Sequence, residues 1–208
     1  MNIIQTIADP AVLERIATLA DSRGWTKETL ITAARESGFP PVQVESDFPL
    51  GPVSAIVMWN VMITTEMRAR LRLLDLKRLK IKDRVRTSII TRLEMLQEHR
   101  EAAIGAWSVL SLARHPGLHA RNLFAIADAI WRECGDTSAG FDFYSKRFML
   151  GLVYRSTLKC WTKDQTPGYT STASILDRNI SRVMQIQTVK WKASQFLMRV
   201  SSSIFPKR

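Results

Sequence analysis

Apolar residues recur at intervals of three and four positions over most of this chain, a spacing that is typical of α-helices. The longest such run extends from Phe141 to Trp161 and follows a loop of glycine and small polar residues. Its apolar side chains lie on several faces, so we expect a central helix that packs against neighbours on several sides. A further helix is expected from Thr172 to Gln187. With about nine or ten helices predicted in total, the fold class is all-α.

The first 47 residues predict two short helices followed by a segment that disfavours a third. Asp9 and Pro10 form a typical helix start, and Thr26 caps a second helix. Two such helices resemble the first half of a helix-turn-helix. A recognition helix should come next, but segment 39–47 contains two prolines and two acidic residues, which interrupt helices and repel phosphate. We therefore interpret residues 1–47 as a vestigial helix-turn-helix unit and do not expect nucleic-acid binding.

Segment 48–65 carries no charged residue, which raises the question of a membrane span. A span needs about 20 apolar residues, and prolines and glycine shorten the apolar part here to Val53–Ile63. Two interpretations stay open, a helix buried in the core and a helix that also lines an apolar cavity facing the central helix. The residues expected to line that cavity are Ile56, Trp59, Met149, Leu152 and Val153.

Segment 68–86 contains nine basic residues interleaved with leucines, and a long helix is expected to continue from Lys82 to Ser111. The favoured interpretation is a solvated helix face and a basic connection between helices. The alternative is a patch that faces anionic lipid.

The last segment, 178–208, contains seven basic residues and no acidic one. If this segment forms a helix, its apolar residues lie on one face, basic residues lie on either side of that face, and polar residues lie opposite. This arrangement is typical of an interfacial membrane helix. We favour this interpretation over a core helix that completes the bundle. The residues expected to bind the membrane are Lys190, Lys192, Phe196, Leu197, Arg199, Val200 and Ile204.

Composition and motifs argue against catalysis and bound metal. Hydrophobic residues make up 46% of the chain, with nine glycines and eight prolines, which is typical of a globular helical protein. Cys134 and Cys160 are the only cysteines, so a disulfide framework or a thiolate zinc site is excluded. His115 and His119 are four apart, but a Pro-Gly pair separates them. No phosphate-binding loop, hydrolase elbow or Glu-x-x-His pair occurs, so we expect no catalytic residue, no metal and no cofactor.

A set of short motifs within residues 118–189 resembles one known family. The motifs are DAIWR at 128–132, GDTS at 135–138, FDFYSKR at 141–147, VY at 153–154, ST at 156–157, and LDR at 176–178 followed by Ile180. Together they are similar to the C-terminal domain of the ninth coenzyme Q biosynthesis protein family, whose members are TetR-like lipid-binding accessory proteins. The chain departs from the family pattern at Gly140, where an acidic residue is expected, and at Phe143, where Trp is expected.

The resemblance implies a TetR-like helical bundle with a lipid-binding and dimerisation domain at 48–187 and an amphipathic, membrane-associating tail at 188–208. It implies a homodimer formed by the two helices expected at 141–161 and 172–187. The implied ligand is an isoprenoid lipid or a ubiquinone intermediate, and the implied partner is demethoxyubiquinone hydroxylase. The patch for that partner would contain Phe143, Tyr144 and Arg147.

The expected function is therefore that of a non-catalytic accessory protein, which docks on an anionic membrane surface, takes up a polyprenylated intermediate and presents it to the hydroxylase. The alternative is a TetR-like, ligand-responsive transcriptional regulator. The first 12 residues show neither a secretory signal nor a transit peptide. We favour a bacterial protein, cytoplasmic and peripheral on the inner membrane, over a processed mitochondrial protein on the matrix side.

Overall fold

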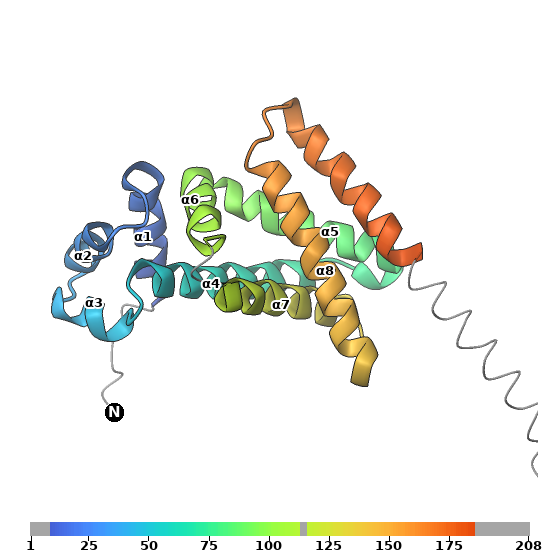
Figure 1. The fold of residues 1–208 in the computed structure, drawn as a ribbon, viewed down its shortest axis with the longest axis horizontal. Coiled ribbons are helices and arrows are strands. Elements are labelled where there is room, and N and C mark those ends of the chain that lie inside the picture. The colour runs from blue at the N-terminus through green and yellow to red at the C-terminus, as the bar shows by residue number, and fades with distance from the viewer. Residues whose placement is uncertain (1–8, 113–115, 186–208) are drawn as a thin grey trace, which may run out of the picture.

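The computed structural model of this 208-residue chain describes residues 9–112 and 116–185, which form helices without any strand (Figure 1). Within these residues the predicted all-α class is confirmed. Eight α-helices are followed by a ninth over 170–185, and short 3-10 turns occupy Leu76–Arg78 and Pro167–Tyr169. The eight helices are α1 (Pro10–Arg23), α2 (Lys27–Glu36), α3 (Val42–Asp47), α4 (Pro52–Arg72), α5 (Ile81–Gln97), α6 (Arg100–Leu110), α7 (Pro116–Glu133) and α8 (Gly140–Trp161).

Helix starts in the N-terminal part follow the local signals in the sequence. The Asp9 carboxylate accepts a hydrogen bond from the backbone N–H of Ala11 at 2.8 Å, with proline as the first residue of α1. Thr26 caps α2 by accepting from the N–H of Thr29 at 3.1 Å. These caps satisfy backbone N–H groups that have no partner within the helix.

A third short helix, α3, follows the two prolines, although the sequence argued against it. Pro40 and Pro41 precede the helix and do not interrupt its interior, so the expected breakage does not occur. The six residues of α3 include Glu45 and Asp47 and no basic residue. The helix exists, but its charge remains unsuited to phosphate.

The single long helix expected from Lys82 to Ser111 is wrong, because the chain breaks between α5 and α6. His99 leaves the helical conformation with φ of −129°. Its ring contacts two carboxylates of α1, those of Glu14 and Asp21, each at 2.7 Å. Asp21 also accepts from the backbone N–H of Ala102 at 2.8 Å and so caps α6 from a distant helix. Sequence periodicity alone could not show this break.

The helices share one continuous core that includes the N-terminal part. Helix α1 packs against α2, α4 and α6, while α7 packs on both α4 and α8. Trp25, which lies between α1 and α2, donates its indole N–H to the carbonyl of Ala102 at 2.8 Å and lies 5.4 Å from the Trp59 ring. Among the described helices, none has the length and apolarity that crossing a membrane requires.

Candidate functional site

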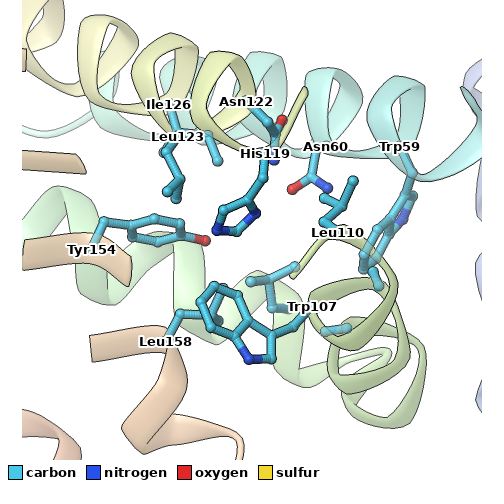
Figure 2. Close-up of a pocket in the computed structure, with 13 residues that line it drawn as sticks. Trp59, Asn60, Trp107, Leu110, His119, Asn122, Leu123, Ile126, Tyr154 and Leu158 are labelled. Atoms are coloured by element: carbon cyan, nitrogen blue, oxygen red, sulfur yellow. The ribbon is translucent and has the colours of Figure 1, made fainter. Parts of the chain in front are cut away.

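A small cavity lies where α4, α6, α7 and α8 meet, and aromatic rings converge on it (Figure 2). Its volume is about 30 Å³, which is room for about one water molecule. Trp107 and His119 pack ring against ring at 5.3 Å. The lining residues are Trp59, Asn60, Leu96, Ala103, Ala106, Trp107, Leu110, His119, Asn122, Leu123, Ile126, Tyr154 and Leu158.

Two of the residues that line this cavity carry buried polar atoms without partners. Among the described residues, the indole nitrogen of Trp59 and both ring nitrogens of His119 are buried with no hydrogen-bond partner. Burial lowers the pKa of His119, and the nearby positive charge of Arg155 lowers it further. The imidazole is therefore neutral at neutral pH. Unsatisfied buried polar groups cost free energy, so this cavity favours a molecule that can hydrogen-bond to them.

A fully buried arginine lies behind the cavity wall. The Arg92 guanidinium donates to the hydroxyls of Tyr154 at 2.8 Å and Thr64 at 2.9 Å, and to the side-chain oxygen of Asn60 at 2.7 Å. All three partners are neutral, so dipoles and not a carboxylate stabilise this buried charge. Asn60 and Tyr154 connect that charge to the cavity, because both also line it.

The five residues predicted to line a cavity are not brought together. Trp59 lines the cavity, whereas Ile56 and Val153 are buried elsewhere in the core and Met149 is half-buried. Leu152 is 47% exposed, so its predicted position in a cavity wall is wrong. The reason is that α7 packs on α4, whereas α8 packs mainly on α7. Periodicity could have identified Tyr154 and Leu158, which lie four apart on one face of α8, but not His119.

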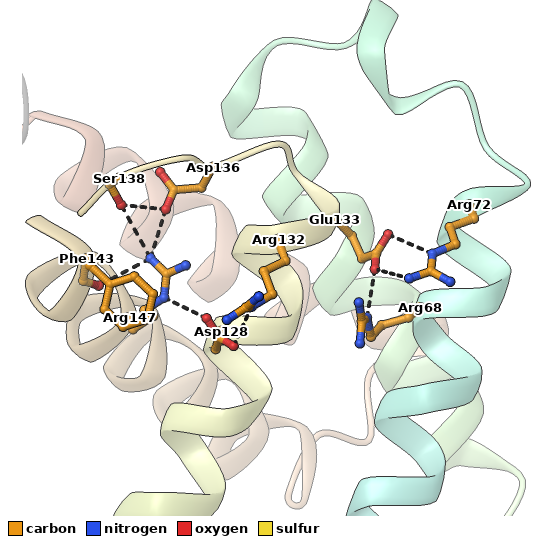
Figure 3. A network of polar contacts seen from close by, with 9 residues as sticks. All are labelled: Arg68, Arg72, Asp128, Arg132, Glu133, Asp136, Ser138, Phe143 and Arg147. Carbon is orange, nitrogen blue, oxygen red and sulfur yellow. Dashed lines mark hydrogen bonds and ion pairs between the residues drawn. The ribbon is translucent and has the colours of Figure 1, made fainter.

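A buried ion-pair network fastens the start of α8 to the end of α7 (Figure 3). Arg147 is 2% exposed and donates to the carboxylates of Asp128 and Asp136, each at 2.8 Å. Its guanidinium lies 3.6 Å from the centre of the Phe143 ring. Burial alone would raise the pKa of Asp136, but hydrogen bonds from Lys146, Ser138 and Arg147 outweigh it and lower that pKa to about 2.

The network changes the predicted partner patch. Arg147 cannot meet a partner, because its side chain is buried and paired, so its assignment as a contact residue is corrected. Phe143 is half-buried between Arg147 and the rings of Phe124 and Tyr144. Tyr144 is 64% exposed and available for contact. Arg147 therefore packs against Phe143 from inside the protein and holds the predicted partner patch in position.

Large apolar side chains continue outward along α8 from this patch. Phe141, Tyr144, Phe148 and Leu152 recur at intervals of three and four and are all exposed, and we call them the α8 apolar face. Contiguous exposed apolar surface marks interaction sites. Gly140 opens α8 with φ of 58°, a left-handed conformation that glycine adopts without strain and an acidic residue would not.

The membrane-binding residues predicted between Lys190 and Ile204 lie outside the described residues. That prediction therefore stays a prediction. The same holds for the homodimer, since the structure contains one chain.

Comparison with known proteins gives one consistent result. Residues 117–187 match the family model described as COQ9. The chain is 24% identical over 180 residues to the mitochondrial ubiquinone biosynthesis protein COQ9 of Drosophila melanogaster, covering 85% of this chain and 55% of that protein. It is 27% identical over 194 residues to the probable protein coq9 of Dictyostelium discoideum (87% and 60%), and 23% over 181 residues to human COQ9 (84% and 57%). The chain thus spans little more than half the length of these curated relatives, which are named as mitochondrial proteins.

Proposed function

We propose, because this chain is a relative of the COQ9 ubiquinone biosynthesis proteins, that it is a non-catalytic accessory protein of ubiquinone biosynthesis. The match over 117–187 confirms the resemblance suggested by the motifs and carries the proposal. That segment contains α7, α8 and the ion-pair network between them. The network fixes the orientation of the α8 apolar face, which is suited to binding and carries no catalytic constellation.

The ligand we propose is a polyprenylated aromatic intermediate taken from the membrane. Burying each methylene of such a chain stabilises the complex by about 0.8 kcal/mol. The cavity of about 30 Å³ is too small for this ligand, so uptake requires α6 and α7 to separate. Trp59 and His119 would then hydrogen-bond to oxygen atoms on the ligand ring.

Lipid extracted from the purified full chain should contain a prenylated quinone precursor, as detected by mass spectrometry. Replacing His119→Leu should reduce the amount recovered, because the ring oxygen loses its partner. Gln97 is exposed on α5 and does not line the cavity, so Gln97→Leu is the control. Purified protein without any isoprenoid lipid would contradict this part of the proposal.

The partner we propose is a demethoxyubiquinone hydroxylase, which performs the chemistry. Tyr144 and the edge of Phe143 would meet it, on the surface that Arg147 holds in place. Tyr144→Ala should weaken the complex by roughly 1 to 2 kcal/mol, the range of an interface aromatic, while changing the free energy of unfolding by about 0.5 kcal/mol or less, as is usual for exposed positions. Calorimetric titration with the hydroxylase measures the first quantity, and urea unfolding measures the second.

The control is Val61→Ala, since Val61 is also exposed but lies on α4. Equal losses of hydroxylase binding in both variants would show that Tyr144 has no special role.

We also propose that the protein is peripheral on an anionic membrane through residues 188–208, and that it is a homodimer through α8 and the helix at 170–185. The proposed location is the matrix side of the inner mitochondrial membrane or the corresponding face of a bacterial inner membrane. The mitochondrial names of the relatives support the first location.

The transcriptional-regulator alternative is not favoured. The helix at the recognition position, α3, is six residues long with two acidic residues and no basic one. Phosphate binding dominates DNA affinity and requires basic side chains. A gel-shift that shows a specific duplex bound at physiological salt would reverse this judgement.

A further inference from the structure

Residues 73–82, which comprise the connection between α4 and α5 and the first two residues of α5, combine exposed leucines with basic side chains. Leu73 is 87% exposed, and Leu74, Leu79 and Ile81 are exposed as well, while Leu76 points into the core. The basic residues Lys77, Arg78, Lys80 and Lys82 are interleaved with them, and all four are exposed. The one acidic residue in the segment, Asp75, pairs with Arg78 at 2.6 Å. We propose that this α4–α5 connection is a membrane-docking surface that contacts anionic phospholipid, additional to the C-terminal tail.

Arg84 holds the connection in shape. Its guanidinium donates to the backbone carbonyls of Leu79, Lys77 and Cys134, each at 2.9 Å. The first two bonds fix the curve of the connection, and the third fastens it to the end of α7. The buried side chain of Leu76 anchors the connection to the protein core. The exposed leucines are therefore presented in a fixed arrangement, which lowers the conformational entropy lost on binding.

The connection lies at the end of the molecule where the described chain stops. The helix at 170–185 runs antiparallel to α5. Glu94 and Gln97, near the end of α5, line one pocket together with Gly168, Tyr169, Thr172 and Ala173. Arg86, near the start of α5, pairs with Asp177 further along the chain at 2.7 Å. The start of α5 therefore lies near residue 185 (Figure 1). The chain continues from there with five more basic residues and no acidic one. The α4–α5 connection therefore lies near the point from which this basic part of the sequence continues.

The chemistry favours a bilayer over nucleic acid. Phosphate of either source attracts the lysines, and the attraction extends over about 10 Å at 0.1 M salt. Nucleic-acid backbone offers no apolar partner for four aliphatic side chains, whereas the boundary between headgroups and acyl chains does. Basic residues that alternate with exposed leucines match that boundary.

This inference rests on the proposed membrane association and assigns a second contact to it. The test uses the full chain with two kinds of vesicle, phosphatidylcholine containing cardiolipin and phosphatidylcholine alone. In the first measurement, Lys80→Glu with Lys82→Glu is compared with Lys159→Glu and Lys163→Glu. The control pair is exposed at the C-terminal end of α8 and changes the net charge equally. We expect the first pair to weaken partitioning onto cardiolipin vesicles about tenfold or more and the control pair much less.

A second measurement reports insertion directly. An environment-sensitive fluorophore is attached at Leu73→Cys in a Cys160→Ser background, in which the remaining Cys134 is buried. The matched site is Leu50→Cys, also exposed and placed before α4. Emission should shift to the blue with cardiolipin vesicles at position 73 and stay unchanged at position 50.

The outcomes separate the inference from the function on which it rests. If the unaltered chain fails to bind either vesicle, the membrane association itself is overturned, and the inference with it. If the unaltered chain binds but both lysine pairs behave alike and position 73 shows no shift, only the inference is overturned. Loss of duplex DNA binding in the Lys80 and Lys82 variant, with vesicle binding unchanged, would assign the surface to nucleic acid and also overturn it.

Discussion

Arg147 shows how burial decides the role of one residue. The side chain is charged and is the last residue of the motif at 141–147, so an exposed contact role was expected, yet it is paired with two carboxylates inside the protein. Removing one partner of a buried ion pair leaves the others desolvated and unpaired, which costs about 3 to 5 kcal/mol. An exposed pair contributes about 0 to 1 kcal/mol. Both kinds of ion pair occur in this network, because Asp128 pairs with the buried Arg147 and also with the exposed Arg132.

The first prediction compares these two arginines. Arg147→Met should lower the free energy of unfolding by about 3 to 5 kcal/mol, because Asp136 loses its buried partner. Arg132→Met, which touches the same Asp128 from solvent, should lower it by about 1 kcal/mol or less. Urea unfolding followed by circular dichroism measures both. Similar losses in the two variants would show that the burial of Arg147 has no energetic consequence.

The second prediction concerns acid stability. The pKa of Asp136 in the folded protein is about 2, below its ordinary value of 3.8. A lowered carboxyl pKa means that the ionised form stabilises the fold above about pH 4, and that this contribution is lost as pH falls towards 2. Asp136→Asn should therefore be less stable than the unaltered protein at pH 7, and the difference should shrink between pH 4 and pH 2. A difference that stays constant over this range would contradict the assignment.

At the scale of elements, residues of α1 determine where α5 ends and α6 begins. Glu14 and Asp21 on α1 hold His99 at the break, and Asp21 caps α6. The capping carboxylate comes from a residue 81 positions away in the chain. The helix boundary therefore depends on how α1 docks.

The third prediction concerns that docking. Burial alone would lower the pKa of His99, but hydrogen bonds to Glu14 and Asp21 and their charges raise it above 6.5. A raised histidine pKa means that the stabilisation is fully present below pH 6.5 and is lost as pH rises through the folded pKa. The urea midpoint of the unaltered protein should thus fall as pH rises past neutrality. His99→Gln should be less stable than the unaltered protein below pH 6.5, and its urea midpoint should not show this fall as pH rises past neutrality. A variant with the same pH dependence as the unaltered protein would refute the role of His99.

At the scale of the whole molecule, the exposed apolar surface of residues 9–112 and 116–185 is concentrated at two places, the α8 apolar face and the α4–α5 connection. We assign the second to the bilayer. The first is long enough to serve both proposed protein contacts, with Tyr144 towards the hydroxylase and Phe148 and Leu152 towards a second copy.

The fourth prediction tests the second copy. Phe148→Asp places a charge on an exposed apolar position, so it should convert a dimer into a monomer that keeps its helical circular-dichroism spectrum. Light scattering after size exclusion measures the mass. Val61→Asp is the control, because it introduces the same charge at an exposed position of α4. A mass that is the same for the unaltered protein and both variants would place the dimer contact elsewhere.

The sequence by itself determined the helical class, the capped starts of α1 and α2, and the extent of α8, which was expected from residue 141 and begins at 140. These features depend on interactions between residues a few positions apart, which periodicity and capping signals report directly. The motifs likewise placed the resemblance at 118–189, and the family model matches 117–187.

Only the tertiary structure decided which face of α8 is buried, where α5 ends, and what Arg147 contacts. Apolar side chains surround α8, so no single stripe marks its inner face, and the choice between Leu152 and Tyr154 depends on where α7 packs. The α5 boundary depends on carboxylates of α1, and the burial of Arg147 depends on two acids brought together at the end of α7. Each of these outcomes is set by contacts between distant parts of the chain, and a local pattern contains no information about which distant residues will supply them.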